Sequence, residues 1–154
     1  MALRYWTGGH TKHRLLYYLV WVPKYRKRGL QGKVAWWVRH LLYEACKVNG
    51  WWIEEVKVLP DHVHVLIQVR PTEPLASVVQ ALKGGTSYRL RQEFPDLEEF
   101  IWGDHLWAEG YFAETVGAKS YAAVKRYIKE NADSMPQEKR GRGESLLRRK
   151  AVSG

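Results

Sequence analysis

The segment LPDHVHVLIQV, from Leu59 to Val69, constrains the fold of this chain more than any other. Its β-branched and aliphatic residues follow a Pro-Asp turn, which predicts a strand inside a sheet. Side chains two residues apart on a strand point to the same face, so His62 and His64 project together. Val63 and Val65 project to the other face. The sequence therefore places two imidazoles side by side on a strand that is otherwise apolar.

Two imidazoles in this position suit a metal site. Neutral rings can share one divalent ion, whereas two imidazolium rings would repel each other. A solvated sheet face would hold the same pair, so the spacing alone leaves both interpretations open. A zinc site with a third histidine also fits, and His13 and His105 begin predicted strands from which they could supply it. The remaining histidines are His10 and His40, and His40 lies among apolar neighbours in a predicted helix.

The rest of the chain predicts an α+β fold. Apolar runs and turn signals place strands at residues 13–25, 51–60, 62–69 and 105–117, and helical periodicity places helices at residues 33–50, 71–95 and 120–134. Gly84-Gly85 is a weak point in the second helix, and Ser120 is placed as the N-cap of the third. The first six elements form the ferredoxin-like arrangement, an antiparallel sheet with helices on one face, followed here by a C-terminal helix that carries a tyrosine.

The length and composition fit one domain with a basic tail. The chain has 154 residues, 45% of them hydrophobic, and we expect a single domain over residues 1–135. The net charge is +9, and six basic against two acidic side chains in residues 136–154 account for +4 of it. We expect residues 136–154 to be a mobile basic tail and the partner of the chain to be a nucleic acid.

Two absences in the sequence bear on where the protein works. Cys46 is the only cysteine, which excludes a disulfide within the chain. No apolar run is long enough for a signal peptide or a membrane span. We therefore expect a cytoplasmic protein that does not associate with a membrane.

A second pair of candidate residues lies in YAAVKRYIKEN, from Tyr121 to Asn131. Tyr127 and Asn131 are four residues apart, so on a helix they share one face, about 6 Å apart along the axis. A phenolic oxygen can attack phosphorus as a nucleophile, and an amide oxygen can bind a hard metal ion. By spacing alone, the simpler interpretation is favoured: a core tyrosine and a surface asparagine near the end of a helix.

Four local patterns occur in order along the chain: LPDHVHVLI, ALKGGTSYRLRQEFP, LWAEGYFAETVG and YIKEN. The first resembles the HUH motif (His, hydrophobic, His) of the single-tyrosine transposases, which serve small insertion sequences that move as single-stranded DNA. The others resemble a Lys-Gly helix, a Leu-Trp, Tyr-Phe and Thr-Val-Gly strand, and the catalytic helix of that family. The resemblance runs from about His13 to Asn131. It departs at Asn131, where the family usually has glutamine, which is one methylene longer.

The resemblance implies a DNA transposase with a metal-assisted tyrosine. His62, His64 and Asn131 would bind Mg²⁺ or Mn²⁺, and Tyr127 would attack the scissile phosphate. The products would be a 5′-phosphotyrosine link and a free 3′-hydroxyl, and attack by another 3′-hydroxyl would rejoin the DNA. Such proteins work as homodimers with shared active sites, in which the tyrosine helix of one subunit often completes the histidine site of the other. Gly117 would then be the hinge.

The resemblance also implies that the substrate is a hairpin in single-stranded DNA. Lysine and arginine side chains bind phosphates, and aromatic rings stack on unpaired bases. The candidate contact residues are Arg14, Lys24, Tyr25, Arg26, Lys83, Arg89 and Arg91.

Three other functions are compatible with the same residues. A related host enzyme would use them to process chromosomal palindromes. A catalytically idle protein would only bind hairpin DNA, and the substitution at Asn131 favours it weakly. A zinc-dependent hydrolase would use His62 and His64 with a third histidine and would not need Tyr127.

Overall fold

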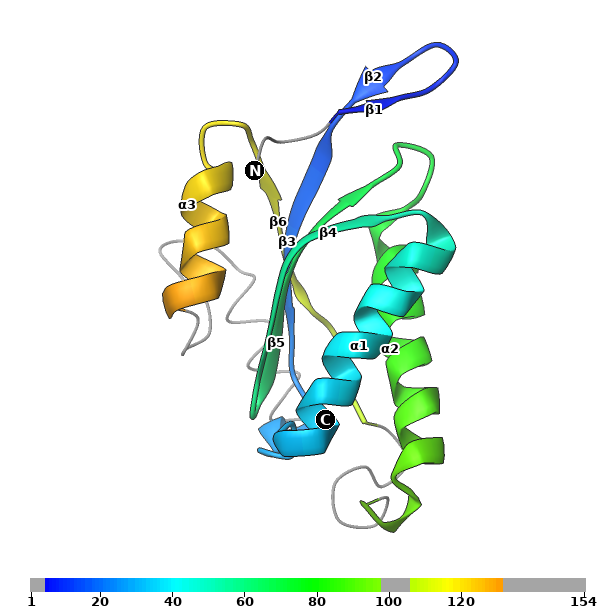
Figure 1. Cartoon of the computed structure of the whole chain (residues 1–154), viewed down its shortest axis with the longest axis vertical. Helices are drawn as coiled ribbons and strands as arrows, with labels where there is room; N and C mark the ends of the chain where they lie inside the picture. The colour runs from blue at the N-terminus through cyan, green and yellow to red at the C-terminus, as the bar shows by residue number, and fades with distance from the viewer. Residues whose placement is uncertain (1–4, 98–105, 132–154) are drawn as a thin grey trace.

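The computed structural model describes residues 5–97 and 106–131 (Figure 1). Its strands are β1 (Trp6–Thr7), β2 (Lys12–His13), β3 (Leu15–Trp21), β4 (Trp52–Leu59), β5 (His62–Val69) and β6 (Phe112–Val116). Its helices are α1 (Gly32–Asn49), α2 (Leu75–Glu93) and α3 (Tyr121–Arg126), with short 3-10 turns η1 (Lys24–Arg26) and η2 (Pro95–Leu97). A π-helical turn, η4 (Tyr127–Asn131), continues α3. No helix in these ranges is long and apolar enough to cross a membrane.

Four strands form an antiparallel sheet in the order β4-β5-β3-β6. β3 pairs with β5 from Leu15 opposite Val69 to Trp21 opposite Val63. With α1 between β3 and β4 and α2 between β5 and β6, this is the ferredoxin-like order, and the predicted fold class is confirmed. The strand that carries the two histidines is one of the two central strands.

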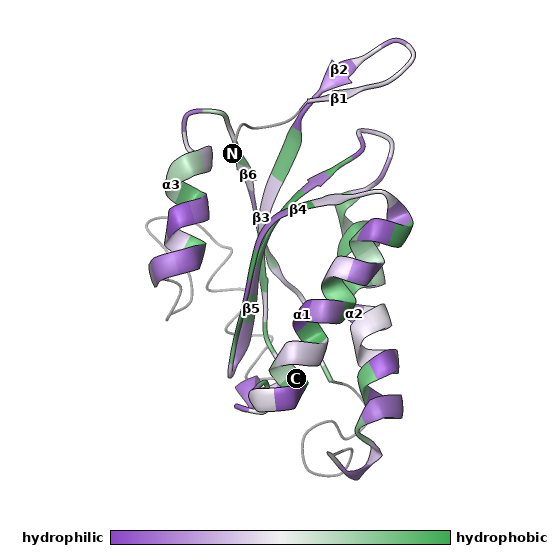
Figure 2. Ribbon diagram, viewed as in Figure 1, coloured by the Kyte–Doolittle hydropathy of each residue, from purple (hydrophilic) through white to green (hydrophobic). Residues whose placement is uncertain are grey.

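Different helices cover the two faces of the sheet. α1 and α2 lie on one face and α3 lies on the other (Figure 1). Side chains of β3 alternate between two cores: Leu19 and Trp21 pack with α1 and α2, whereas Tyr18 and Val20 pack toward α3. Hydrophobic and hydrophilic bands alternate along α1 and α2, as expected for helices with one face on a sheet (Figure 2).

Two predicted strands are shorter in the structure, and one predicted weak point in a helix is not a break. The first predicted strand, residues 13–25, is only β3, and a two-stranded hairpin of β1 and β2 precedes it. Within predicted strand 105–117, the described strand is Phe112–Val116, and Trp107 makes an isolated bridge to Pro23. α2 runs unbroken through Gly84-Gly85, because its buried apolar face outweighs the low helix propensity of two glycines.

The last helix begins where the sequence predicts but changes its geometry early. Ser120 is the N-cap residue, yet its hydroxyl contacts the backbone of Gly117 instead of an amide in the first turn. After Arg126 the backbone continues as the π turn, which ends at Asn131. The predicted basic tail, residues 136–154, lies outside the described residues.

Leu19 is fully buried in β3 against α1 and α2. We expect Leu19→Ala to lower the free energy of unfolding by about 2–5 kcal/mol, because it removes apolar contacts and leaves a cavity in a central strand. Urea titration followed by circular dichroism measures this change. Val48→Ala is the control, since Val48 is 85% exposed, and we expect it to cost less than about 0.5 kcal/mol. A similar cost for both variants would contradict the position of the core.

Candidate metal and nucleophile site

The central strand β5 holds the histidine pair inside the molecule. His62 and His64 are 1% and 0% exposed, and their ring centroids lie 4.8 Å apart with the ring planes at 74°. A buried ring nitrogen without a partner costs free energy, so each of these atoms has to be paired or be available to a ligand. Both rings follow the same pattern: a protein group contacts Nδ1, and none in the described residues contacts Nε2.

Asp61, in the turn before β5, fixes the ring of His62. Its Oδ1 lies 2.6 Å from His62 Nδ1, and its Oδ2 lies 3.0 Å from Arg26 Nη2 and 3.8 Å from Arg28 Nη1. Burial alone would raise the pKa of the Asp61 carboxyl, but the hydrogen bonds and charges of His62 and Arg26 outweigh burial and lower it. An ionised carboxylate only accepts hydrogen bonds, so His62 donates through Nδ1, and the tautomer that this contact favours has its lone pair on Nε2.

Tyr18, on the neighbouring strand β3, contacts the second ring. Its hydroxyl oxygen lies 2.6 Å from His64 Nδ1, and the two rings are stacked with centroids 5.7 Å apart. Burial lowers the pKa of His64 to about 3, and the charges of His62 and Lys57 act in the same direction, so the imidazole is neutral at pH 7. Burial also raises the pKa of the Tyr18 phenol, which therefore stays protonated.

The two Nε2 atoms are a suitable donor pair for a divalent cation. They are buried, they lie on one face of a strand, and they have no hydrogen-bond partner in the described residues. Within residues 5–97 and 106–131, no group of three or more His, Cys, Asp or Glu side chains could hold a metal ion. A third protein ligand would therefore be another residue type or lie outside these ranges.

The described residues do not assemble the three-histidine zinc site. His13 lies in β2, where its Nδ1 is 3.1 Å from Thr11 Oγ1. His40 lies on the exposed side of α1, and His10 lies in the exposed turn between β1 and β2. His105 lies outside the described residues.

α3 and η4 bring Tyr127 to the histidine pair. The centroid of its ring lies 6.4 Å from that of His64 and 6.4 Å from that of Tyr18. Tyr127 is half-buried and is the first residue of the π turn, a conformation that is frequent at functional sites. The tyrosine and the histidines therefore form one cluster within a single chain.

Polar and apolar contacts attach α3 to the sheet. The Tyr121 hydroxyl donates to Glu54 Oε2 at 3.0 Å, and Gln68 Nε2 donates to Glu54 Oε1 at 3.1 Å. Ile128, seven residues further along, is fully buried in the core on this face. These contacts link β4 and β5 to the helix and fix the position of the tyrosine between them.

Asn131, the predicted third metal ligand, is the last residue of η4. Its spacing from Tyr127 falls within the π turn and not within the α-helix that the sequence predicts. The side chain of Asn131 lies outside what the structure describes, so its role stays a prediction.

Three of the predicted DNA-contact residues lie near the histidine site. Arg26 binds Asp61, and Lys24 and Tyr25 precede it in η1. Tyr25 is 56% exposed, and the Lys24 ammonium lies 5.5 Å from the centre of its ring. This turn presents one aromatic ring and positive charge to the solvent.

The other four predicted contact residues lie elsewhere. Arg14 precedes β3 at the end of the strand farther from η1, and its guanidinium lies 4.2 Å from the centre of the Tyr5 ring. Arg89 and Arg91 belong to α2, which covers the face of the sheet opposite the histidines. Lys83, also on α2, donates to two carbonyl oxygens of the segment before β6, at 2.7 and 3.1 Å. The seven residues do not form one surface, and their contacts with DNA stay predictions.

Three residues that organise the site are not among the candidates that the sequence suggests: Tyr18, Asp61 and Glu54. Asp61 directly precedes His62, and this adjacency is a usable signal for a carboxylate that orients an imidazole. Tyr18 meets His64 only through the pairing of β3 with β5, where Val20 lies opposite His64. No local pattern in the sequence specifies that pairing.

Comparisons with known proteins agree on one family. Residues 11–131 match the family described as Transposase IS200 like. The chain is 35% identical over 121 residues to the ISDra2 transposase TnpA of Deinococcus radiodurans. This match covers 79% of this chain and 86% of that protein. The chain is also 32% identical over 124 residues to the transposase for insertion sequence element IS200 of Salmonella typhimurium. This match covers 80% of this chain and 81% of that protein.

Solved structures with the same fold include two transposases. The crystal structure of a proposed transposase from Deinococcus radiodurans has a TM-score of 0.68 and 31% identity, and the match covers 83% of this chain and 98% of that chain. A REP-associated tyrosine transposase bound to a REP hairpin has a TM-score of 0.60, with 81% of this chain and 72% of that chain covered. Its identity of 14% makes this second likeness one of fold alone.

The buried His64 ring makes folding of the metal-free chain depend on pH. Its pKa is about 3 in the folded chain against 6.5 in the exposed ring, so the unfolded chain binds one more proton between these values. Above about pH 6.5 this ring therefore does not change the free energy of unfolding. As the pH drops from there toward 3, the free energy of unfolding falls. We expect the free energy of unfolding of His64→Asn to change less steeply in this range, by up to about 1.4 kcal/mol per pH unit. Urea titrations at several pH values measure both slopes, and equal slopes would contradict a neutral buried ring.

Proposed function

The chain belongs to the IS200-like transposase family, and we propose that it cuts and rejoins single-stranded DNA through a covalent link to Tyr127. One observation carries this proposal: Tyr127 lies beside two buried histidines whose Nε2 atoms have no partner in the described residues. Phosphoryl transfer needs a nucleophile next to groups that stabilise charge on the phosphate. A phenol beside two metal-binding imidazoles meets both requirements.

The proposed metal ligands are His62 and His64, through their Nε2 atoms, with Asn131 as the third. Imidazole nitrogens accept several first-row metals, whereas an amide oxygen favours Mg²⁺ or Mn²⁺, so we propose one of these two ions. When bound, such an ion neutralises charge on the non-bridging oxygens of the scissile phosphate.

Asp61 and Tyr18 prepare the two rings for this role. An imidazole that binds through Nε2 carries its proton on Nδ1, and the Asp61 carboxylate accepts a hydrogen bond from this N–H of His62. The Tyr18 oxygen can accept the corresponding hydrogen bond from His64, since a hydroxyl both donates and accepts. Asp61 and Tyr18 are therefore positioning residues, which set the tautomer and orientation of the ligands.

Tyr127 makes and breaks the bonds. Its phenolic oxygen attacks phosphorus, so that a bond from tyrosine oxygen to phosphorus forms and the bond from phosphorus to the 3′ oxygen breaks. The phenol loses its proton as it attacks, and the departing 3′ oxygen takes up a proton and leaves as a free hydroxyl. The 5′ phosphate stays on the tyrosine. Attack by a 3′-hydroxyl from another strand end reverses these steps. The phosphodiester energy is kept throughout, and no nucleotide is hydrolysed.

The proposed substrate is single-stranded DNA that folds into a hairpin. The net charge of +9 favours a polyanionic partner. A REP-associated tyrosine transposase of the same fold is bound to a REP hairpin. Near the histidine site, Lys24 and Arg26 are suited to phosphates and the exposed Tyr25 ring to an unpaired base.

We further propose a homodimer with shared active sites and a hinge at Gly117. Tyr127 lies beside the histidines of its own chain in the structure. An exchange between subunits would therefore require α3 to leave the contact of Tyr121 with Glu54 and to dock on the sheet of the partner.

Three other functions make different demands on Tyr127. A catalytically idle protein would bind the hairpin and form no covalent link. A zinc-dependent hydrolase would stay active without the phenolic oxygen. A host enzyme that processes chromosomal palindromes would share the chemistry and would differ in the DNA that it meets.

Tyr127→Phe removes the nucleophile and keeps the ring. We expect the wild-type chain, incubated with Mn²⁺ and single-stranded DNA from both flanks of its gene, to form an adduct that survives a denaturing gel. The variant should form none. Tyr88→Phe, at a tyrosine that is 65% exposed on α2, is the matched control and should form the adduct as the wild type does. An adduct on Tyr127→Phe would refute the nucleophile, and DNA hydrolysis without an adduct would favour the zinc hydrolase.

Tyr18→Phe removes the oxygen that contacts His64 Nδ1 and keeps the stacked ring. We expect Mn²⁺ binding, measured by isothermal titration calorimetry, to weaken about 10- to 100-fold, which is typical when a group that orients a metal ligand is lost. Tyr17→Phe is the matched control, because Tyr17 lies on the other face of the same strand. Wild-type affinity in Tyr18→Phe would show that this contact does not prepare the ligand.

A further inference from the structure

Lys57, on the edge strand β4, lies directly beside the histidine pair. The register of β4 and β5 puts Lys57 opposite His64 and Leu59 opposite His62. Side chains opposite each other in an antiparallel pair stand on the same face, with their Cβ atoms about 4.5–5.5 Å apart. Lys57 therefore projects from the face of the sheet that carries the two histidines. No step of the mechanism above uses this side chain.

A contact with the π turn locates the ammonium group of Lys57. Its Nζ donates to the carbonyl oxygen of Lys129 at 3.3 Å. Lys129 comes two residues after Tyr127 in η4, which continues α3 on this face of the sheet (Figure 1). The ammonium thus lies between the strand next to the histidines and the turn that carries the tyrosine.

The positive charge of Lys57 reaches the imidazole of His64. Burial is the largest cause of the low pKa of His64, and the charges of His62 and Lys57 lower this pKa further. Among the described residues, no carboxylate forms an ion pair with Lys57. Its charge is therefore not cancelled by an acidic side chain.

A lone cation in this place is unfavourable for a metal site. The ammonium and a divalent ion on the histidines would repel each other, and this repulsion weakens metal binding. The contact with Lys129 does not explain the lysine, because an exposed hydrogen bond of a long, flexible side chain adds little stability. An anion between the two cations reverses the balance, since both then attract it.

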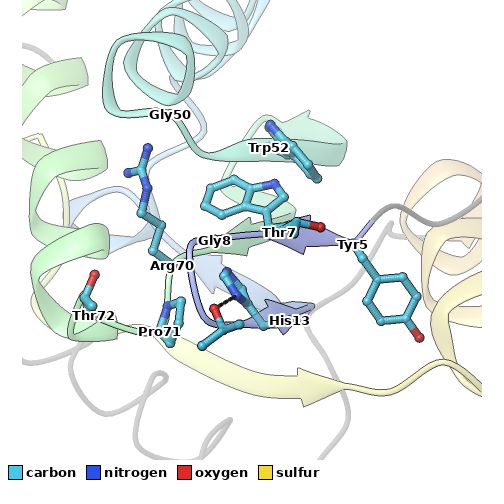
Figure 3. A pocket seen from close by; sticks show the side chains of 11 residues that line it. Tyr5, Thr7, Gly8, His13, Gly50, Trp52, Arg70, Pro71 and Thr72 are labelled. Atoms are coloured by element: carbon cyan, nitrogen blue, oxygen red, sulfur yellow. Dashed lines mark hydrogen bonds between the residues drawn. The ribbon is translucent and has the colours of Figure 1, made fainter.

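Arg70, a second basic side chain close to β5, lies at the opposite end of this strand. It directly follows Val69 and lines a pocket of about 580 Å³ together with Trp52 and His13 (Figure 3). His62 and His64 do not line that pocket. An anion held at the histidines is therefore within reach of Lys57, and Arg70 is directed to a different part of the molecule.

We propose that Lys57 is a catalytic residue whose ammonium donates a hydrogen bond to a non-bridging oxygen of the phosphate that Tyr127 attacks. This role rests on the proposed function. A fixed positive charge next to these oxygens stabilises the negative charge that they carry in the transition state. The proton stays on Nζ throughout, so the bonds that form and break are those already described.

The same ammonium can hold the phosphate and the π turn together. It has three N–H donors, and the Lys129 carbonyl oxygen uses one of them. A second donor is enough for the phosphate oxygen. Lys57 would then set the distance between the scissile phosphate and the turn in which Tyr127 lies, and a short gap between reacting atoms accelerates the attack.

Lys57→Met removes the charge and keeps a flexible side chain of similar length. We expect formation of the covalent adduct, at saturating Mn²⁺ and saturating single-stranded DNA from both flanks of the gene, to slow about 10- to 100-fold. Mn²⁺ binding to the DNA-free chain, measured by isothermal titration calorimetry, should tighten about 2- to 10-fold, because the repelling charge is gone. A misfolded variant would lose both, so the opposite directions of the two changes distinguish the proposed role from a structural one.

Two further variants serve as controls. Lys57→Arg keeps the positive charge and should form the adduct faster than Lys57→Met does. Lys47→Met also removes one positive charge, from an exposed position on α1, which packs on the other face of the sheet. It should match the wild-type chain both in adduct formation and in Mn²⁺ binding.

Two outcomes would overturn the role of Lys57. One is adduct formation at the wild-type rate in Lys57→Met, which would leave the chemistry at Tyr127 intact. The other is Mn²⁺ binding that weakens in this variant as much as the reaction slows, which would make Lys57 a support of the histidines alone. A wild-type chain that forms no adduct would instead refute the proposed chemistry itself, so the two failures are distinguishable.

Discussion

The arrangement of this protein depends on burying two imidazoles in the middle of a sheet. Each ring has two nitrogens, and a buried nitrogen without a partner costs free energy. Asp61 and Tyr18 satisfy one nitrogen of each ring, and the Nε2 atoms are left without partners in the described residues. The chain thus fixes the orientation of both rings, and with it the direction of the two Nε2 atoms, by itself. Leaving these two atoms unpaired lowers the stability of the fold, and a ligand bound to them would restore it.

Strand alternation supplies the rest of the site. In β3 and β5, one set of side chains packs with α1 and α2, and the other set faces α3. Val20 lies opposite His64, so Tyr18, two residues along on the same face, is its diagonal neighbour. On the same face, the contact of Tyr121 with Glu54 positions α3 and the π turn over the histidines. The same sheet therefore provides both the apolar core and the polar site.

Patterns among neighbouring residues predict the strands and helices that short-range interactions determine. Alternation and turn residues predict β5 over residues 62–69 as the structure has it, and helical spacing predicts α1 to within one residue at each end. Strand pairing is not local, so the contact of Tyr18 with His64 is not predictable from spacing. No sequence pattern predicts the π turn at Tyr127 either. Charge composition predicts a nucleic-acid partner, yet it does not say which face carries the charge, and the seven predicted contact residues are spread over both sides of the sheet.

The central claim is that His62 and His64 present their Nε2 atoms to one divalent ion beside Tyr127. A crystal structure of the full chain with Mn²⁺, in which anomalous scattering locates the metal, tests it most directly. We expect one manganese ion bonded to Nε2 of both histidines, with Asp61 and Tyr18 still in contact with the Nδ1 atoms. Saturating Mn²⁺ without an ion at the histidines, or an ion bound elsewhere in the molecule alone, would contradict the claim.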